Sequence, residues 1–386
     1  MTEIGRRAFN LGLTGALGTG LIGGSIGTAR AYSGPNVIIV RFGGGVRRTE
    51  TIMGKASYAP YMLNVLAKRG TLIPNMSIAQ LDDVDTSHAE GTLNILTGRY
   101  RGYSKVGTQG LAPLLEPNAP TLFEYVRKAY NIPAHQALLV NGEDRPQEEY
   151  LTYGGHAHYG VSYRSEVIGL FRYKIHKFRR ILEEKSASED VLADADKQLK
   201  ELLGQDYRGT AGSNSKVLDG FWDRWREQYG DTGLKNPRGD RPLTELAVKA
   251  LRELKPRLMM INYQDPDYVH WGNASHYTRA IGIIDQGLKR LVDTVDLDPA
   301  YRDRTVFAIV PDCGRDANGL MSVPFQHHFN TRSSHEIFGL FFGPGIARGK
   351  LLDKEVDQSS IAATIGAIMG FKAEGAEGRA LSEILT

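Results

Sequence analysis

The stretch between residues 305 and 346 is the densest group of potential metal ligands and proton carriers in the sequence. Two apolar runs, Thr305–Val310 and Ile337–Phe342, have the length and content of fully buried strands. Between them lie Asp312, Cys313, Asp316, His327, His328, His335 and Glu336. Ligands of open α/β sheets bind beyond the carboxyl ends of the strands, so we expect chemistry just after the first run.

A second group of such residues follows another run that reads as an inner strand, Leu258–Asn262. Asp265, Asp267 and His270 come directly after it. A carboxylate and an imidazole three to five residues apart on a loop after a strand can bind one cation. The two groups together predict a metal site more strongly than either does alone.

A third group, Thr86, Ser87 and His88, begins a predicted helix that ends at Thr97-Gly98. Ser or Thr at a helix start is commonly an N-cap. The same place suits a nucleophile, because the free backbone N–H groups and the helix dipole stabilise an anion there. Both interpretations stay open at this stage.

The elements that must position these residues alternate between strand and helix, which indicates a mainly parallel sheet. Predicted strands lie at 36–41, 71–76, 137–140, 258–262, 305–310 and 337–342, and helices at 56–69, 88–96, 120–129, 243–254 and 275–295. The glycine run after the first strand has neither the Lys-Ser/Thr of a P-loop nor a dinucleotide fingerprint.

Residues 152–241 interrupt this alternation and predict a helical insertion that covers the site or packs at its edge. The segment contains a charged helix over 166–203 with a break at 186–188. His156 and His158 alternate, so they either share one face of a strand or are ordinary loop histidines.

Residues 1–31 read as an export signal. Arg6-Arg7 precedes a weakly apolar, glycine-rich run, and Ala29-Arg30-Ala31 fits a cleavage site. Paired arginines suggest the twin-arginine route, and the run is too weakly apolar to be a membrane span. We therefore expect the mature protein, residues 32–386, to be periplasmic or otherwise exported. Attachment to a membrane would require that the signal is not cleaved.

The net charge and the cysteine count limit which functions and cross-links the chain can have. The 47 basic and 44 acidic residues leave a net charge of +3, which gives no argument for nucleic-acid binding. The single cysteine, Cys313, excludes an internal disulfide, so it is a free thiol, a metal ligand or a buried apolar residue.

The order of these motifs resembles the alkaline phosphatase superfamily, which includes phosphodiesterases, sulfatases and cofactor-independent phosphoglycerate mutases. The matching segments are Ile38–Gly44, Thr86–Gly98, Asp265–His270, Asp312-Cys313-Gly314 and His335. The resemblance implies an α/β fold: a three-layer αβα sandwich with a mainly parallel sheet and a helical insertion.

The resemblance also implies two metal sites. The first would take Asp267 or Asp265, His270 and His335, and the second Asp312 and Cys313. In the family, the first strand ends in an aspartate that also binds this second metal. That position falls on Gly43 or Arg41 here, so this carboxylate is missing from the second site. One or two divalent ions are implied, zinc first, with manganese or calcium as alternatives. His327 and His328 are further ligands, acid–base groups or surface histidines.

The nucleophile position is ambiguous. Counting back from Thr97-Gly98 lands on His88, with Ser87 one residue away and Thr86 two, and Arg315 is a candidate clamp on an anion. A formylglycine sulfatase needs a Cys or Ser followed by x-Pro-x-Arg, which Cys313 does not provide.

Two functions remain. One is an exported metal-dependent hydrolase of phosphate mono- or diesters that acts on a small-molecule phosphate ester. The other is a catalytically inactive relative of this fold that serves as a binding or structural subunit, as the missing aspartate and Cys313 suggest.

Overall fold

The computed structural model describes residues 31–53, 57–81, 84–109, 112–142, 146–206, 208–209, 215–230, 239–270, 274–316, 326–327 and 330–386. The export signal predicted over residues 1–31 falls almost entirely outside these residues. Within the described part, no helix is both long enough and apolar enough to cross a membrane.

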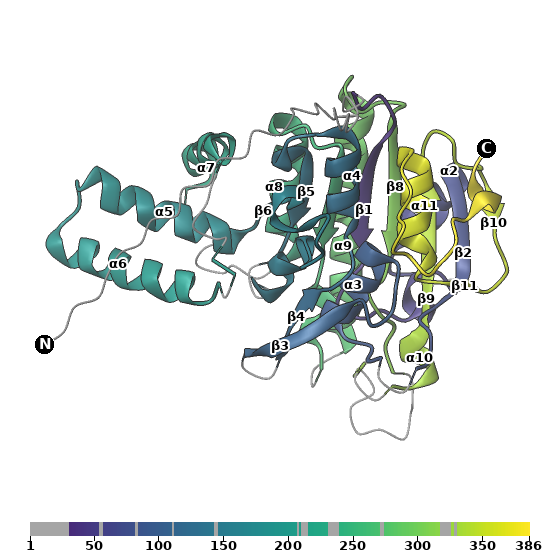
Figure 1. Ribbon diagram of the computed structural model, residues 1–386. Coiled ribbons are helices and arrows are strands. Elements are labelled where there is room, and N and C mark those ends of the chain that lie inside the picture. Colours follow the sequence, from purple (N-terminus) through teal and green to yellow (C-terminus); the bar gives the residue numbers. More distant parts are fainter. Residues whose placement is uncertain are drawn as a thin grey trace, which may run out of the picture.

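A nine-stranded sheet forms the centre of the described part, in the order β10-β2-β9-β8-β1-β7-β5-β6, with β11 also paired to β2 (Figure 1). Its strands are β1 (Asn36–Arg41), β2 (Gly70–Ser77), β5 (Ala137–Val140), β6 (Glu166–Ile168), β7 (Leu258–Asn262), β8 (Thr305–Val310), β9 (Glu336–Phe342), β10 (Lys350–Leu351) and β11 (Val356–Asp357). Only β9 is antiparallel to its neighbours, β2 and β8. The prediction of a mainly parallel sheet is therefore confirmed.

The three central strands, β8, β1 and β7, are buried along their whole length. Successive residues of a strand point to opposite faces, so each strand supplies two hydrophobic cores. In β1, Ile38 and Val40 belong to one core and Val37 and Ile39 to the other. The apolar runs that predicted these strands are continuous because both faces of the sheet are covered.

Helices cover both faces and complete a three-layer αβα sandwich (Figure 1). On one face lie η1 (Met62–Leu66), α2 (Ala67–Arg69), α8 (Asp240–Glu253) and α9 (Ala274–Leu297). On the other face lie α3 (His88–Thr97), α4 (Leu122–Tyr130) and α11 (Ser360–Met369). The remaining elements are the short helices α1 (Arg48–Thr51) and α10 (Arg332–His335), the hairpin β3 (Tyr103–Gln109) and β4 (Ala112–Pro117), and the 3₁₀ turns η2 (Ala134–Gln136), η3 (Pro146–Thr152), η4 (Gly160–Tyr163), η5 (Asp265–Tyr268) and η6 (Ser382–Ile384).

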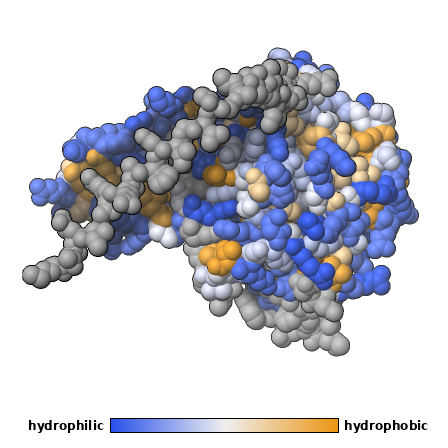
Figure 2. Space-filling model, in the orientation of Figure 1, coloured by the Kyte–Doolittle hydropathy of each residue, from blue (hydrophilic) through white to orange (hydrophobic). Residues whose placement is uncertain are grey.

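Three helices, α5 (Leu170–Glu184), α6 (Glu189–Gly204) and α7 (Lys216–Tyr229), lie on the β6 side of the sheet. The break expected at 186–188 separates α5 from α6, which extend away from the sheet as a hairpin (Figure 1). Phe171 and Ile175 of α5 pack with α6 in a small separate apolar cluster, whereas apolar residues of α7 and of the first turn of α5 belong to one of the two main cores. Figure 2 shows a mostly hydrophilic face on which hydrophobic residues form small separate patches. A covering role for this insertion stays a prediction.

We expect Asp285 of α9 to make the free energy of unfolding depend on pH. Its carboxylate accepts hydrogen bonds from the backbone N–H groups of Tyr61 and Met62, at 2.9 and 2.8 Å. Burial raises the pKa of Asp285 although these bonds act to lower it. The folded state therefore binds the carboxyl proton of Asp285 more tightly than the unfolded state does. The free energy of unfolding should fall as the pH rises from about 4 through the folded-state pKa, by up to about 1.4 kcal/mol per pH unit.

Urea unfolding of the wild type and of Asp285→Asn across this pH range measures the effect. The variant should show a flatter pH dependence. Asp293→Asn, which alters a half-exposed carboxylate of the same helix, is the matched control and should keep the wild-type dependence. Equal pH dependence in wild type and Asp285→Asn would contradict the prediction.

Candidate metal centre

The carboxyl edge of the central strands brings the predicted site segments together. Arg41, the last residue of β1, pairs in register with Asn262 of β7 and with Val310 of β8. The loops that follow these strands therefore begin side by side. The first turn of α3 meets the same edge, because a Cβ on Gly91 would lie 2.2 Å from the carbonyl oxygen of Asp312.

Three imidazole rings converge on one carboxylate oxygen, Oδ1 of Asp267. The Nε2 atoms of His88, His270 and His327 lie 2.7, 2.8 and 3.1 Å from it. The rings of His88 and His327 are 4.4 Å apart, and those of His270 and His327 are 4.9 Å apart. His88 and His327 are buried, whereas the His270 side chain is 20% exposed and forms the solvent side of the cluster.

The other nitrogen of each ring faces a hydrogen-bond acceptor. Nδ1 of His88 is 2.7 Å from Oδ2 of Asp312, and Nδ1 of His327 is 3.0 Å from the carbonyl oxygen of Thr86. Nδ1 of His270 is 2.7 Å from Oε1 of Gln326, whose Nε2 donates to the His270 carbonyl at 3.2 Å. A carboxylate or a carbonyl can only accept, so each Nδ1 carries the proton.

It follows that each neutral ring directs the lone pair of its Nε2 at Asp267. The ligand atoms of His88, Asp267 and His327 all lie within 4.8 Å of one another, and His270 approaches the same Asp267 oxygen from outside this group. Lone pairs and a carboxylate this close repel one another, and a cation among them removes the repulsion. Protonating all three rings instead would place three positive charges within one cluster. One carboxylate and three imidazoles are a donor set that fits zinc.

Asp312 lies behind His88 and is completely buried. Its Oδ1 accepts from the backbone N–H of Cys313 at 2.8 Å and of Gly45 at 3.3 Å. Burial alone would raise the pKa of Asp312, but the hydrogen bond from His88 and the positive charge of Arg41 hold it below its usual range. Asp312 is therefore an ionised acceptor that fixes the tautomer and orientation of His88.

Cys313 is also buried at this edge, and with His88 and Asp312 it forms a second group of potential ligands among the described residues. Burial and the adjacent Asp312 carboxylate raise the pKa of its thiol. A protonated thiol is a poor metal ligand.

The two predicted hydroxyl nucleophiles are engaged in local structure. Ser87 is the N-cap of α3: its Oγ accepts from the backbone N–H of Glu90 at 3.2 Å and donates to the Glu90 carboxylate at 3.1 Å. Thr86 is buried, and its hydroxyl donates to the carbonyl of His327. Thr86 and His327 thus hold each other through two hydrogen bonds.

Asp265 and Arg315 face away from the cluster. Asp265 accepts from the backbone N–H of Asp240, whose carboxylate accepts from the N–H of Asp265. The Arg315 guanidinium is fully buried and donates to backbone carbonyls of two other loops, at Gly44 and Gly45 and at Pro266 and Val269. Arg315 therefore ties these loops together.

His335 lies at the end of α10, and its ring does not join the other three. Its Nδ1 is 3.1 Å from the carbonyl oxygen of Ile78 and its Nε2 is 2.6 Å from Oδ1 of Asn330. Burial lowers the pKa of His335. His328 lies outside the described residues. His156 and His158 are in the loop before η4, where their rings are 5.8 Å apart.

Two residues at the site were not singled out by the sequence. Gln326 orients His270, and Glu148 is bonded to Arg41 at 2.8 Å. Glu148 belongs to η3, in the connection that follows the parallel strand β5. Because this connection follows the carboxyl end of β5, a site residue could have been expected in it. Four acidic residues lie between 143 and 149, however, and the sequence does not show which of them points toward the site.

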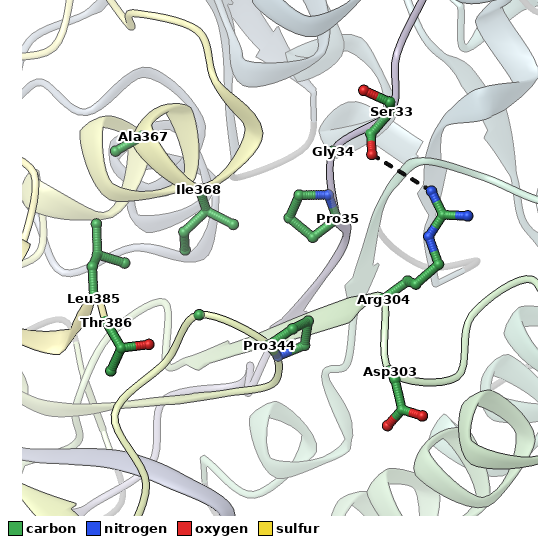
Figure 3. A pocket seen from close by; sticks show the side chains of 11 residues that line it. Ser33, Gly34, Pro35, Asp303, Arg304, Pro344, Ala367, Ile368, Leu385 and Thr386 are labelled. Atoms are coloured by element: carbon green, nitrogen blue, oxygen red, sulfur yellow. Dashed lines mark hydrogen bonds between the residues drawn. The ribbon is translucent and has the colours of Figure 1, made fainter.

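A cavity of about 450 Å³ lies at the opposite edge of the sheet (Figure 3). It is lined by residues 33–35 and 303–304, which precede β1 and β8, together with 344–345, 367–368 and 385–386. Neither Asp267 nor any of the three histidines around it lines this cavity.

Comparisons with known proteins agree with this architecture. No protein-family model and no curated protein sequence matches the chain. Among solved structures, a variant of alkaline phosphatase PafA matches with a TM-score of 0.56 and 12% identity, over 92% of this chain and 100% of that one. The PsFucS1 sulfatase from Pseudoalteromonas sp. matches with a TM-score of 0.52 and 12% identity, over 92% of this chain and 72% of that one.

Wild-type PafA gives a TM-score of 0.54 at 11% identity, again over 92% of this chain and 100% of that chain. At such identities the likeness establishes the fold rather than the activity. The layer order, the sheet and these matches lead to one conclusion: the chain has the alkaline phosphatase superfamily fold.

Proposed function

We propose that the chain is an exported, metal-dependent hydrolase of phosphate mono- or diesters. The observation that carries the proposal is the convergence of three Nε2 atoms on Oδ1 of Asp267, with every Nδ1 proton already committed elsewhere. A divalent cation at such a place polarises a phosphoryl oxygen and makes water a nucleophile at neutral pH. The fold shared with an alkaline phosphatase supports the reaction class.

In this proposal Asp267, His88, His270 and His327 are the ligands. Three imidazoles favour zinc, with manganese second, over calcium, which prefers oxygen ligands alone. Asp312 and Gln326 are positioning residues, because they hold the rings of His88 and His270. Substrate would approach from the side of His270, the most exposed of the three histidines.

The attacking oxygen in this proposal comes from water. His88 stands at the first position of α3, where its Nδ1 donates to Asp312 and its Nε2 faces Asp267. The hydroxyls of Ser87 and Thr86 hold the helix start and the His327 backbone. The new bond forms between the water oxygen and phosphorus, the ester P–O bond breaks, and the proton that the water loses balances the one that the leaving alkoxide takes up.

A second candidate is a catalytically inactive protein that holds the metal and serves as a binding or structural subunit. The observation that favours it is the placement of Arg315, which is fully buried and donates to four backbone carbonyls. Because both candidates need the metal centre, turnover separates them.

Metal analysis and turnover of the purified protein test the proposal. We expect tightly held zinc or manganese, and hydrolysis of 4-nitrophenyl phosphate or bis(4-nitrophenyl) phosphate that a chelator abolishes and the metal restores. Bound metal without turnover of either ester would favour the binding protein, and protein without metal would overturn both. Export is tested by fractionating cells that express the full chain or a chain with Arg6→Lys and Arg7→Lys, which should remain in the cytoplasm.

A further inference from the structure

Arg41 carries a positive charge into the interior of the site. It ends the central strand β1 and is completely buried. Its Nη1 donates to Oγ1 of Thr92 at 2.7 Å and to Oε2 of Glu148 at 2.8 Å, and lies 3.7 Å from Oδ2 of Asp312. An arginine side chain keeps its charge in proteins, so this cation is permanent.

The surroundings hold this guanidinium in place. Its Nη2 donates to the carbonyl of Tyr263 at 3.3 Å, and Asn262 donates to the same Glu148 carboxylate at 3.2 Å. Position 43 has no room for a side chain beside it, because a Cβ there would lie 1.9 Å from the Tyr263 carbonyl oxygen. A carboxylate therefore cannot be supplied from Gly43.

Two groups of potential ligands share His88 in the described part of the chain. One contains Asp267 and His327, and the other contains Asp312 and Cys313. Arg41 lies beside the second group only. The Asp312 carboxylate already accepts from His88 and from two backbone N–H groups, and it faces the guanidinium, so a cation bound there would meet a fixed positive charge.

The balance of buried charges also argues against a second cation beside Asp312. The carboxylates in direct contact within this network, Asp267, Asp312 and Glu148, carry three negative charges. Arg41 supplies one positive charge, and one divalent cation at Asp267 supplies two. Buried charges need to be paired, and a second divalent cation would leave two positive charges in excess.

We propose that the centre binds a single divalent cation, at Asp267, His88, His270 and His327, and that the Arg41 guanidinium takes the place of a second cation beside Asp312. This inference rests on the proposed metal centre, and it gives Asp312 the role of a positioning residue and Cys313 the role of a buried thiol.

The experiment measures metal stoichiometry and the spectrum of the cobalt form. Chelator-treated wild type, Arg41→Met and the control Arg47→Met, whose arginine pairs with Glu50, are loaded with Zn²⁺ or Co²⁺ and freed of excess metal. Wild type and the control should retain one equivalent and show no thiolate-to-cobalt charge-transfer band. Arg41→Met should take up a second, weaker equivalent and acquire that band, because Asp312, Glu148 and Cys313 have lost their counter-cation.

Two equivalents in the wild type, or a thiolate band in its cobalt spectrum, would overturn the inference, as would a folded Arg41→Met that binds one equivalent only. If Arg41→Met does not fold, the wild-type stoichiometry and spectrum decide alone. One equivalent without ester turnover would leave this inference standing and refute the hydrolase. Two equivalents with turnover would refute this inference and support the hydrolase. A protein that binds no metal would refute both the inference and the hydrolase.

Discussion

Replacing Asp267 with asparagine should prevent tight metal binding at the proposed centre and abolish the proposed ester hydrolysis. Oδ1 of Asp267 is the one atom that all three Nε2 atoms approach, and the amide keeps the shape of the side chain while losing its charge. The affinity loss should exceed the roughly 10–100-fold that removal of an outer-shell partner costs. Metal content after gel filtration and kcat/KM for both nitrophenyl esters measure the effect.

Asp265→Asn is the matched control, since Asp265 lies in the same 3₁₀ turn but bonds to the start of α8. It should leave the metal content at the wild-type level. If Asp265→Asn lost the metal and Asp267→Asn kept it, the ligand set proposed above would be wrong. The same pair of variants decides between the two aspartates that the sequence left open.

Gly91→Ala should destabilise the protein and separate His88 from Asp312. Alanine is favoured over glycine inside a helix by about 1 kcal/mol. At position 91, however, a Cβ would lie 2.2 Å from the carbonyl oxygen of Asp312, and this neighbour is backbone that cannot rotate away. Overpacking of this kind costs about 1–3 kcal/mol, occasionally more, so the net sign is destabilising. Because α3 must move, metal affinity should fall as well.

Gly282→Ala provides the comparison within a helix. Gly282 lies in α9, and a Cβ there would lie 3.7 Å from its nearest neighbour, the carbonyl oxygen of Tyr58, which is ordinary contact. This variant should be stabilised, by up to about 1 kcal/mol, and should bind metal normally. Chemical unfolding of both variants measures the difference, and equal stability of the two would contradict the close approach of α3 to the Asp312 loop.

The strands could be predicted because burial on both faces leaves a continuous apolar run. The runs at 36–41, 258–262 and 305–310 became β1, β7 and β8 with the same bounds. The loops at their carboxyl ends could therefore be expected to meet. Which histidines of the last loop turn inward could not be read in the same way, because a loop has no repeating pattern that relates position to direction.

His327 and His335 illustrate this limit. Both follow β8, yet Thr86 holds His327 toward Asp267, whereas His335 turns to Ile78 and Asn330. The partner of Arg41 could not be predicted from the sequence either. Glu148 is 107 residues away and meets Arg41 only because β5 and β1 flank β7 in the sheet.

Both margins of the large sheet consist of very short strands. On one side β6 has three residues, and on the other β10 has two. Unpaired edge strands invite other chains to add to a sheet, and short ones offer few backbone groups for this. Copies of this chain that meet at high concentration would therefore find little template for intermolecular β-pairing, which lowers the risk of ordered aggregation.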